Sequence, residues 1–438
     1  MLYDFTKHTA PKMPPLGKGL ECIKLLASQV SPDMRESVVP MLFSSLGAHV
    51  SGAEFQYPSL VWMEPTGQIA HLVGPSGIGK GQLTRCTEAI MRRFREHDKA
   101  KLQEIVEWSK TTQSKGANKD KPARPDAALW FPPANTTSAA FLQNAMALEL
   151  EGNHAQFFEM PEVEMAERMC GGHKWMSVTI RNIFDCARDG ALRATANGVT
   201  GNPILRANME VMSTPVSARN FYRNEVMNGT LGRVRMSYKP RQARSGKIPR
   251  QGTFDATFLS KLDLYLDRLE ACKGRFIIPK LNKIADQLAA EMANMGDLTD
   301  NDPLWEMGKR AIIGAWKCGC IMWILNGQQW TRSIGEMVVF LAGHDMWSKM
   351  QVFGDMFLDG DAGISSSAKS GPKNMLDSLP DSFSEVQLEN IRTTLGKSQD
   401  AKNQLKQWLH RKFITYSAQT GLYTKTEEYL RKHPQPQN

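Results

Sequence analysis

The sequence lacks the marks of a membrane or secreted protein. None of its apolar runs approaches the roughly 18 residues that a membrane-spanning helix needs. The N-terminal stretch also lacks the charged and then apolar layout of a signal peptide. These absences predict a cytoplasmic protein with no membrane partner.

Cysteine is scarce and scattered, which argues against a disulfide scaffold. The 438 residues include seven cysteines, an odd number, and only Cys318 and Cys320 lie close together. A single residue between two cysteines suits neither a zinc site nor a redox pair, whose motifs are spaced more widely. We expect reduced thiols in the protein core, as is usual in the cytoplasm.

What is present is an ordinary globular composition with an excess of positive charge. Hydrophobic residues make up 41% and charged residues 23% of the chain, and the length allows about two to four domains. Lysine and arginine outnumber aspartate and glutamate by 54 to 45, which gives a net charge of +9. This charge favours a polyanionic partner such as nucleic acid without requiring one.

One stretch, residues 68–85, organises the rest of the chain. Its apolar run Ile69–Val73 predicts a buried strand, and the spacing of apolar residues predicts a helix over residues 83–94. Between them lies a glycine-rich loop with a lysine, made of Gly74, Pro75, Ser76, Gly77, Ile78, Gly79, Lys80, Gly81 and Gln82. Strand, glycine loop, lysine and helix are the arrangement of a phosphate-binding loop.

The chemistry of such a loop follows from its residue types. Glycine lets backbone N–H groups converge on phosphate oxygens, because it has no Cβ and tolerates positive φ. The N-terminus of the following helix adds partial positive charge. Lys80 would reach the β- and γ-phosphates of ATP. The alternative is a glycine-rich turn that binds nothing.

Gly81 departs from the pattern of the motif. Phosphate-binding loops have serine or threonine at this position, where the hydroxyl group holds Mg²⁺. Thr84, one helical turn further on, could replace this hydroxyl as a metal ligand, and so could water. The departure weakens the prediction of hydrolysis more than the prediction of nucleotide binding.

An apolar strand that ends in acidic residues is predicted at 155–158. Phosphate-loop enzymes place an acid at the end of such a strand, where it holds Mg²⁺ or polarises the attacking water. Glu159 is the first candidate for this role, as a metal ligand or as the catalytic group that polarises the water, and Glu162 and Glu164 come next. The alternative is an ordinary acidic start of a helix.

Two further residues are candidates for catalysis. Thr214 follows a strand predicted at 207–212, where a polar side chain could orient the attacking water; a strand-end turn is equally compatible. Arg233 precedes a predicted strand and could stabilise the phosphoryl group transferred in a neighbouring subunit. Most arginines near turns have no such role.

The pattern of the first half also predicts several other elements. Helices are expected at 20–30 and 34–46, with Pro32 and Asp33 forming a turn and a helix cap between them. The other expected elements are a strand entering the core at 59–63, a surface loop at 110–124, a strand at 128–131, a helix at 139–148 capped by 135–138, a helix at 175–188 and a strand at 192–196.

The second half is predicted to be helical up to a small C-terminal module. A basic stretch at 239–250 is expected to be an exposed linker, which either lies near phosphate groups or is merely solvated. The apolar spacing over 254–352 predicts a helical bundle, in which the aromatic residues form the core. A Gly/Ser/Lys-rich segment at 358–378 predicts a tether.

The C-terminal segment has the element order of a winged helix-turn-helix. Helices are expected at 384–394 and 398–410, with Ser384 and Ser398 as N-caps, and a hairpin is expected at 413–425. In such modules the second helix enters a major groove of DNA. The candidate DNA-binding residues are Lys402, Lys406, Arg411 and Lys412. The alternative is a module that contacts protein.

Taken in order, these pieces resemble a poorly characterised family of P-loop proteins of phages, plasmids and mobile elements of gut bacteria, related to primase-helicases. Beyond the loop, the resemblance is carried by residues 131–139, 157–159, 212–215 and 228–233, and it covers about half of the chain, residues 20–238. Two features depart from the family pattern, namely Gly81 and the Met160-Pro161 pair after Glu159. No primase metal-binding half is visible in the chain.

The resemblance implies an α/β fold, with a RecA- or AAA-like P-loop NTPase core followed by a helical bundle and the winged helix-turn-helix. The expected domains are an N-terminal helical segment at 1–55, the core at 56–253, a helical domain at 254–357, the linker at 358–378 and the winged-helix domain at 379–438. It also gives weight to Glu159, Thr214 and Arg233 as site residues.

The expected function is a nucleic-acid-dependent ATPase, a replicative helicase or helicase-like loader of a mobile genetic element. It would use ATP and Mg²⁺, act on single-stranded or forked DNA, and assemble into a ring or filament in a bacterial cell or phage-infected host. One alternative, favoured by Gly81, is a nucleotide-binding initiator or regulator that binds DNA without hydrolysis. Another is a small-molecule kinase, against which the basic charge and the winged tail argue.

Overall fold

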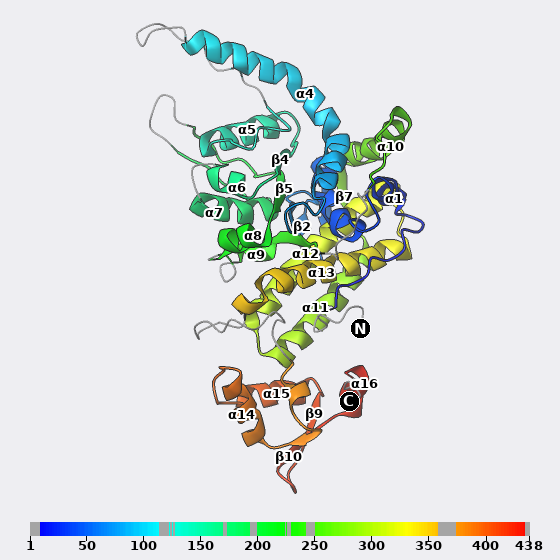
Figure 1. Ribbon diagram of the computed structural model, residues 1–438, viewed down its shortest axis with the longest axis vertical. Helices are drawn as coiled ribbons and strands as arrows, with labels where there is room; N and C mark the ends of the chain where they lie inside the picture. Colours follow the sequence, from blue (N-terminus) through cyan, green and yellow to red (C-terminus); the bar gives the residue numbers. More distant parts are fainter. Residues whose placement is uncertain are drawn as a thin grey trace.

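The computed structural model of the protein describes residues 9–113, 122, 125, 128–169, 173–192, 199–223, 225, 229–241, 250–357 and 374–433 (Figure 1). The described chain is mixed α/β and contains a four-stranded parallel sheet. A smaller C-terminal unit, residues 374–433, lies at the bottom of the view in Figure 1. Within the described ranges, no helix combines the length and the apolarity needed to cross a membrane.

The parallel sheet places the strand that precedes the glycine loop between two later strands. The strands are β3 (Ile69–Val73), β4 (Gln156–Met160), β5 (Ala207–Ser213) and β6 (Val234–Tyr238), in the order β4-β5-β3-β6. Every residue of β3 and β5 is buried, including the polar residues His71, Asn208, Glu210 and Ser213. The strand predicted at 69–73 is confirmed, and those predicted at 155–158 and 207–212 are present with slightly shifted ends.

Because all four strands are parallel, their carboxyl ends form one edge of the sheet. Open α/β sheets bind their ligands at this edge. The elements between the strands are α4 (Gly81–Gln113), α5 (Ser138–Leu150), α6 (Glu164–Arg168), α7 (His173–Phe184), α8 (Pro215–Tyr222) and α9 (Thr230–Arg233). The helix predicted at 139–148 is therefore confirmed as α5, and Thr137 is its N-cap.

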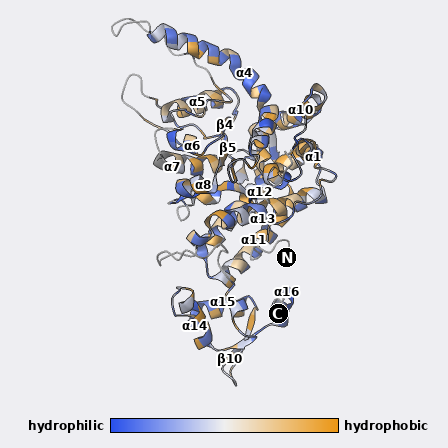
Figure 2. Ribbon diagram, in the orientation of Figure 1, coloured by the Kyte–Doolittle hydropathy of each residue, from blue (hydrophilic) through white to orange (hydrophobic). Residues whose placement is uncertain are grey.

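Helix α4 is much longer than the helix predicted at 83–94. It has 33 residues, and Asp98 is the last of them that is buried. Figure 2 shows that its far end is mostly hydrophilic. The apolar pattern marked only the packed part, because good helix formers such as Lys, Glu and Gln extend a helix without core contacts. Residues 110–113 of the predicted surface loop belong to α4, and 114–121 lie outside the described residues.

The strand predicted at 128–131 is wrong, because side chains satisfy the backbone there. The carboxylate of Asp98 accepts from the N–H groups of Trp130 (2.9 Å) and Phe131 (2.6 Å). The amide of Asn144 bonds the N–H and the C=O of Leu129 at 2.7 and 2.8 Å. One sheet-like bond remains, from the N–H of Phe157 in β4 to the carbonyl of Trp130 (2.8 Å). The segment therefore covers the edge of β4 without joining the sheet as a strand.

The helix expected at 175–188 is shorter than predicted, and the strand expected at 192–196 is largely outside the described residues. The helix expected at 175–188 ends earlier, at Phe184 of α7, and Arg188 instead forms an isolated β-bridge with Ile204. Of the strand expected at 192–196, residues 193–196 lie outside the described residues.

The N-terminal segment is helical, as predicted, and packs against the sheet. It consists of α1 (Glu21–Ser28), α2 (Arg35–Val38), the short 3₁₀ helix η1 (Val39–Met41) and α3 (Leu42–Ala48). Every residue of α3 is buried, and α3 contacts β5 and α4. Met34, not the predicted Asp33, occupies the N-cap position of α2.

A second, three-stranded sheet lies apart from the first. It consists of β1 (Ala53–Gln56), β2 (Trp62–Met63) and β7 (Gly274–Phe276), in the order β2-β1-β7. The prediction of a strand entering the core at 59–63 is wrong, because Leu60 has positive φ and is 75% exposed. Only residues 62–63 form a strand, at the edge of this sheet, where a short apolar run meets solvent.

The helical region predicted for 254–352 is confirmed, with β7 as an interruption. Its helices are α10 (Ala256–Ala271), α11 (Pro279–Thr299), α12 (Asp302–Leu325) and α13 (Arg332–Phe353), followed by η3 (Gly354–Phe357). Buried apolar residues from α1 to α13 form one continuous core. The helices therefore share their core with the parallel sheet.

Helix α13 is fastened to the free edge of β6 by side chains. The Asp345 carboxylate accepts from the N–H of Met236 at 2.7 Å, and the Ser348 hydroxyl accepts from the N–H of Tyr238 at 2.9 Å. Asp345 also forms a buried ion pair with Lys349 at 2.8 Å. Two backbone N–H groups of this edge strand, which would otherwise invite pairing with another chain, are thus satisfied inside the molecule.

The C-terminal unit has its own core around Trp408 and Phe383. It consists of η4 (Leu376–Ser378), β8 (Ser382–Phe383), α14 (Glu385–Thr394), α15 (Lys402–His410), β9 (Ile414–Ser417), β10 (Leu422–Lys425) and α16 (Glu427–Lys432). The strands form an antiparallel sheet in the order β8-β10-β9. Residues 374–378, assigned to the linker from sequence, pack in this unit, and 358–373 lie outside the described residues.

The two helix caps predicted for this unit had different outcomes. Ser384 caps α14 in a reciprocal arrangement with Gln387, as predicted. Ser398 does not cap α15, which begins at Lys402 after Ala401. The carbonyl of Ser398 instead accepts from Nε of Arg392 at 2.8 Å, and the intervening residues form a loop.

Candidate phosphate-binding site

The loop at 74–80 joins the carboxyl end of β3 to the N-terminus of α4. Gly77 and Gly79 have φ of +76° and +98°, values that side chains with a Cβ rarely adopt. A Cβ on Gly74 would come within 3.2 Å of Ile78 and of the carbonyl of Lys239. The three glycines are thus required by backbone conformation at two positions and by close packing at the third.

Lys80 folds back over this loop. Its ammonium group donates to the carbonyls of Gly74 (2.9 Å) and Pro75 (3.1 Å). Burial lowers the pKa of Lys80, and the nearby carboxylate of Glu162 opposes this effect. Charge-assisted bonds to phosphate oxygens are stronger than bonds to neutral carbonyls. A bound phosphate would therefore displace these acceptors.

Sheet register separates the acidic candidates Glu159 and Glu162. Glu159 pairs with Glu210 of β5, which in turn pairs with Ala70 of β3. Since β3 continues for three residues to Val73, Glu159 lies about 10 Å before the loop along the strand direction. Glu162 follows the end of β4 and is exposed. Its negative charge raises the pKa of Lys80. Glu164 begins α6 one step further on.

Glu159 is mostly buried and belongs to a polar cluster below the loop. Its side chain is 10% exposed and pairs with Arg95 of α4 at 3.2 Å. Its Oε1 atom is buried with no hydrogen-bond partner in the described structure. Burial raises the pKa of Glu159, while Arg95 lowers it and the Thr84 hydroxyl acts in the same direction. The structure therefore brings together Thr84 and Glu159, the two candidate metal ligands.

Sequence reasoning missed Glu210, which lies in the middle of β5. The Thr87 hydroxyl contacts both of its oxygens, at 2.9 and 2.8 Å. Burial raises the pKa of Glu210 to about 8; the hydrogen bond from Thr87 opposes this, and the charge of Glu159 adds to it. An acid inside a largely apolar strand was the available signal.

These groups are compatible with Mg²⁺ but do not form a complete protein cage. No group of three or more His, Cys, Asp or Glu side chains in the described ranges could hold a metal ion. Mg²⁺ usually takes one or two carboxylates and completes its shell with water and substrate phosphates. The unpaired Oε1 of Glu159 and the hydroxyl of Thr84 suit that partial role.

Thr214 lies at the same edge of the sheet as the loop. It is the N-cap of α8, where its Oγ1 accepts from the N–H of Ser217 at 3.2 Å. The carbonyl of its neighbour Ser213 accepts from the N–H of Gly74 at 3.1 Å. Thr214 thus caps the helix that follows β5. The bond between Ser213 and Gly74 places it next to the start of the loop.

A buried histidine that sequence reasoning also missed supports this edge. His71 of β3 bonds the hydroxyls of Ser213 (2.8 Å) and Tyr222 (3.1 Å) through its two ring nitrogens. Burial lowers the pKa of His71 to about 3, and the charge of Lys80 acts in the same direction. A neutral imidazole therefore ties β3 to β5 and α8 directly below the loop.

Arg233 lies at the opposite edge of the sheet from the loop. Val234, its neighbour, pairs with Ile69 at the start of β3, whereas the loop follows Val73. The guanidinium group of Arg233 forms an ion pair with Asp185 at 2.8 Å. The structure does not bring Arg233 near the phosphate-binding loop of its own chain.

The four candidate DNA-binding residues have different surroundings. Lys402 and Lys406 are exposed one turn apart on α15. Arg411 pairs with Asp297 of α11 at 2.6 Å and so helps to attach the unit to the helical region. Lys412 is exposed and has positive φ after the end of α15. Lys402 and Lys406 therefore present the clearest basic surface.

Comparisons with known proteins supply no evidence on the fold or on the site. No protein-family model matches the chain, and no curated protein matches it.

Proposed function

We propose that the protein is a nucleic-acid-dependent ATPase with a RecA- or AAA-like core, a helicase or helicase-like loader of a mobile genetic element. The observation that carries the proposal is the loop at 74–80. It has two positive-φ glycines and an inward-turned Lys80, and it follows the buried strand β3 of a parallel sheet. Backbone amides, a helix N-terminus and a lysine then converge where phosphate groups bind.

In this proposal, the residues of the loop hold the triphosphate and Lys80 contacts its β- and γ-phosphates. We assign the polarising of the attacking water to Glu162, which is exposed and whose charge raises the pKa of Lys80. Thr214 orients that water from the neighbouring strand end. Thr84 and Glu159 would hold Mg²⁺, which when bound would supply positive charge near the phosphates.

The experiment that tests this proposal compares Lys80→Ala with the wild type. We expect ATP turnover that rises with single-stranded DNA in the wild type and falls at least about tenfold in the variant, because the charged phosphate contact is lost. Lys99→Ala is the matched control, since Lys99 is an exposed lysine of α4, the helix that follows the loop. Turnover that is unchanged in Lys80→Ala would remove the enzyme interpretation.

A non-hydrolysing initiator or regulator remains the second candidate, because two observations favour it. Gly81 offers no hydroxyl to a metal ion. Burial raises the pKa of Glu159, and Arg95 already occupies one of its oxygens. ATP binding without phosphate release, with and without single-stranded DNA, would support this candidate.

We further propose that residues 379–438 act as a winged helix-turn-helix on DNA, with α15 as the helix that enters the groove. The exposed Lys402 and Lys406 support this role, and β9 and β10 would form the wing. Replacing both lysines with alanine should weaken DNA binding and reduce its dependence on salt. Lys280→Ala with Lys283→Ala removes the same charge from exposed positions of α11 and should leave binding unchanged.

A further inference from the structure

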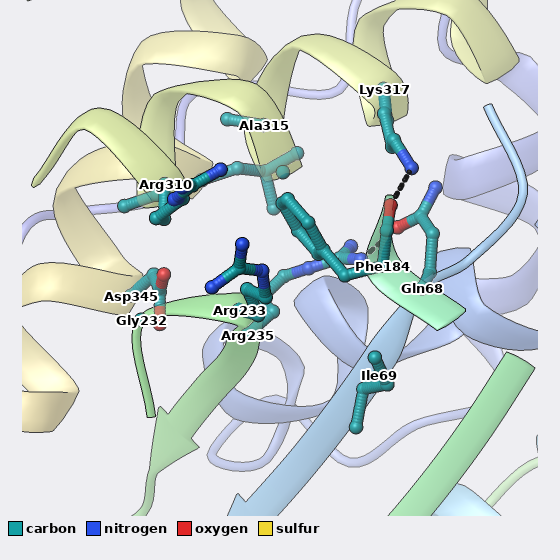
Figure 3. A pocket seen from close by; sticks show the side chains of 13 residues that line it. Gln68, Ile69, Phe184, Gly232, Arg233, Arg235, Arg310, Ala315, Lys317 and Asp345 are labelled. Carbon is teal, nitrogen blue, oxygen red and sulfur yellow. Dashed lines mark hydrogen bonds between the residues drawn. The ribbon is translucent and has the colours of Figure 1, made fainter. Parts of the chain in front are cut away.

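A small hollow near the amino end of β6 lies between the sheet and α12. Three of its basic side chains come from these two elements, Arg235 from β6 and Arg310 and Lys317 from α12. Figure 3 shows them on different sides of the same hollow. Apolar residues form much of the remaining wall, namely Ile69, Phe184, Ala311, Ala315 and Leu341. Charges in such a setting interact strongly, because little water screens them.

The carboxylates in and beside this hollow already have cations as partners. Asp345, which lines it, forms its ion pair with Lys349 at 2.8 Å. Asp185 pairs with Arg233, a further lining residue, at 2.8 Å, and its other oxygen lies 3.8 Å from Arg310. Each of these carboxylates therefore balances one cation, and Arg310 only shares the charge of Asp185.

Arg235 is buried among neutral acceptors. It is 6% exposed, and its guanidinium group donates to the carbonyl of Pro40 at 3.2 Å and to the side-chain oxygen of Gln68. It also donates to the sulfur of Cys318 at 2.7 Å. Burial raises the pKa of Cys318 to about 11, so this thiol is neutral at pH 7 and balances no charge. The Nε atom of Arg235 is buried and has no hydrogen-bond partner in the described structure.

Lys317 is buried in a similar way. It is 1% exposed, and its ammonium group donates to the carbonyls of Thr66 (2.8 Å) and Phe184 (2.6 Å). Among the described residues, neither Lys317 nor Arg235 forms an ion pair with a carboxylate. A buried charge is costly unless an opposite charge balances it. The wall of the hollow thus carries two buried positive charges that call for a counter-ion.

The size of the hollow restricts which anion could balance these charges. Its cavity volume is about 10 Å³. A cavity of this volume accommodates roughly one water-sized particle. A tetrahedral oxyanion such as phosphate is several times larger. Chloride is the abundant anion closest to this size.

We propose that the hollow binds one chloride ion as the counter-ion of Arg235, Lys317 and Arg310. The ion accepts from the Nε of Arg235 and from the partly exposed guanidinium group of Arg310, and the charge of Lys317 attracts it. It thereby stabilises the packing of α12 against β6. The site and the loop at 74–80 lie at opposite ends of the strands, so the site does not depend on the proposed ATPase function.

The test is urea unfolding at constant ionic strength, with sodium chloride replacing sodium gluconate. Chloride that binds only the folded wild type lowers its unfolding equilibrium constant, by about tenfold when the chloride concentration is ten times Kd. Lys317→Met removes one buried charge and keeps a side chain of similar length, so it should lose most of this dependence. Equal chloride dependence in Lys317→Met, or none in the wild type, would overturn the proposal.

Lys309→Met is the matched control on the same helix. Lys309 is exposed and lies over the ring of Trp305 at 3.7 Å. The substitution makes the same change in side chain and net charge, so general effects of the two salts are common to both variants. Lys309→Met should keep the chloride dependence of the wild type. Loss of the dependence in both variants would show a general charge effect and would count against the site.

A second measurement does not require any variant to fold. Crystals of the wild-type protein soaked in sodium bromide should show an anomalous-scattering peak in the hollow, beside Arg235 and Arg310, because bromide replaces chloride. Such a peak, together with the chloride dependence of unfolding, would support the proposal. Bromide bound elsewhere and not in the hollow would overturn it. A peak in the hollow without any chloride effect on unfolding would mark an adventitious ion only and would also overturn it.

Discussion

Replacing Glu210 with glutamine should stabilise the protein at neutral pH. Glu210 is fully buried beneath α4, and its pKa is raised to about 8, whereas the ordinary value is 4.5. The folded chain therefore keeps this acid protonated at pH values where the unfolded chain ionises it. Glutamine has nearly the same shape, bonds the hydroxyl of Thr87 equally well and has no charge to lose.

The size of the effect follows from proton linkage. Below pH 4.5 the acid is protonated in both states, so the wild type and Glu210→Gln should differ little. As the pH rises towards the folded-state pKa of about 8, the wild type loses stability, by about 3 kcal/mol at pH 7 and about 5 kcal/mol in total. Glu210→Gln should not show this loss.

Urea denaturation of both proteins from pH 5 to 8.5 would measure the difference. Other groups titrate in the same range, but they are common to both proteins and cancel in the comparison. Glu88→Gln, at an exposed position of α4, is the control and should follow the wild type. Parallel stability curves for the wild type and Glu210→Gln would refute a neutral buried acid at this position.

Substitutions at three other positions test the site and the fold. Gly81→Ser places a hydroxyl at the metal position of the loop, where a Cβ meets no atom within 4 Å; it should raise Mg²⁺-dependent turnover, and Gly81→Ala should not. Asp345→Ala leaves Lys349 buried without its carboxylate and should cost about 3–5 kcal/mol of unfolding free energy, whereas a loss of about 1 kcal/mol or less would contradict the buried ion pair. Thr214→Ala removes the cap of α8 and should cost about 1 kcal/mol. Thr214→Ser should restore both stability and turnover, and a turnover loss confined to Thr214→Ala beyond the stability effect would mark a role with water.

The amino-acid sequence by itself determined the features that depend on neighbouring residues. The apolar run at 69–73 specified a buried strand, and Ser384 with Gln387 specified the start of α14. The helical pattern over 254–352 likewise needed only local spacing. Local patterns failed where distant side chains satisfied the backbone, as Asp98 and Asn144 do at 128–131.

Only the tertiary structure decided which distant residues meet. Sheet register places Glu159 beside Glu210 and well before the loop, whereas Glu162, three residues later, lies by Lys80. The sequence analysis ranked Glu159 before Glu162, because the sequence does not show which residues pair across the sheet. The meeting of Arg233 and Arg310 at Asp185 likewise depends on how α12 packs against the sheet. Such contacts join segments more than 40 residues apart, and the packing of the shared core fixes them, which no local pattern encodes.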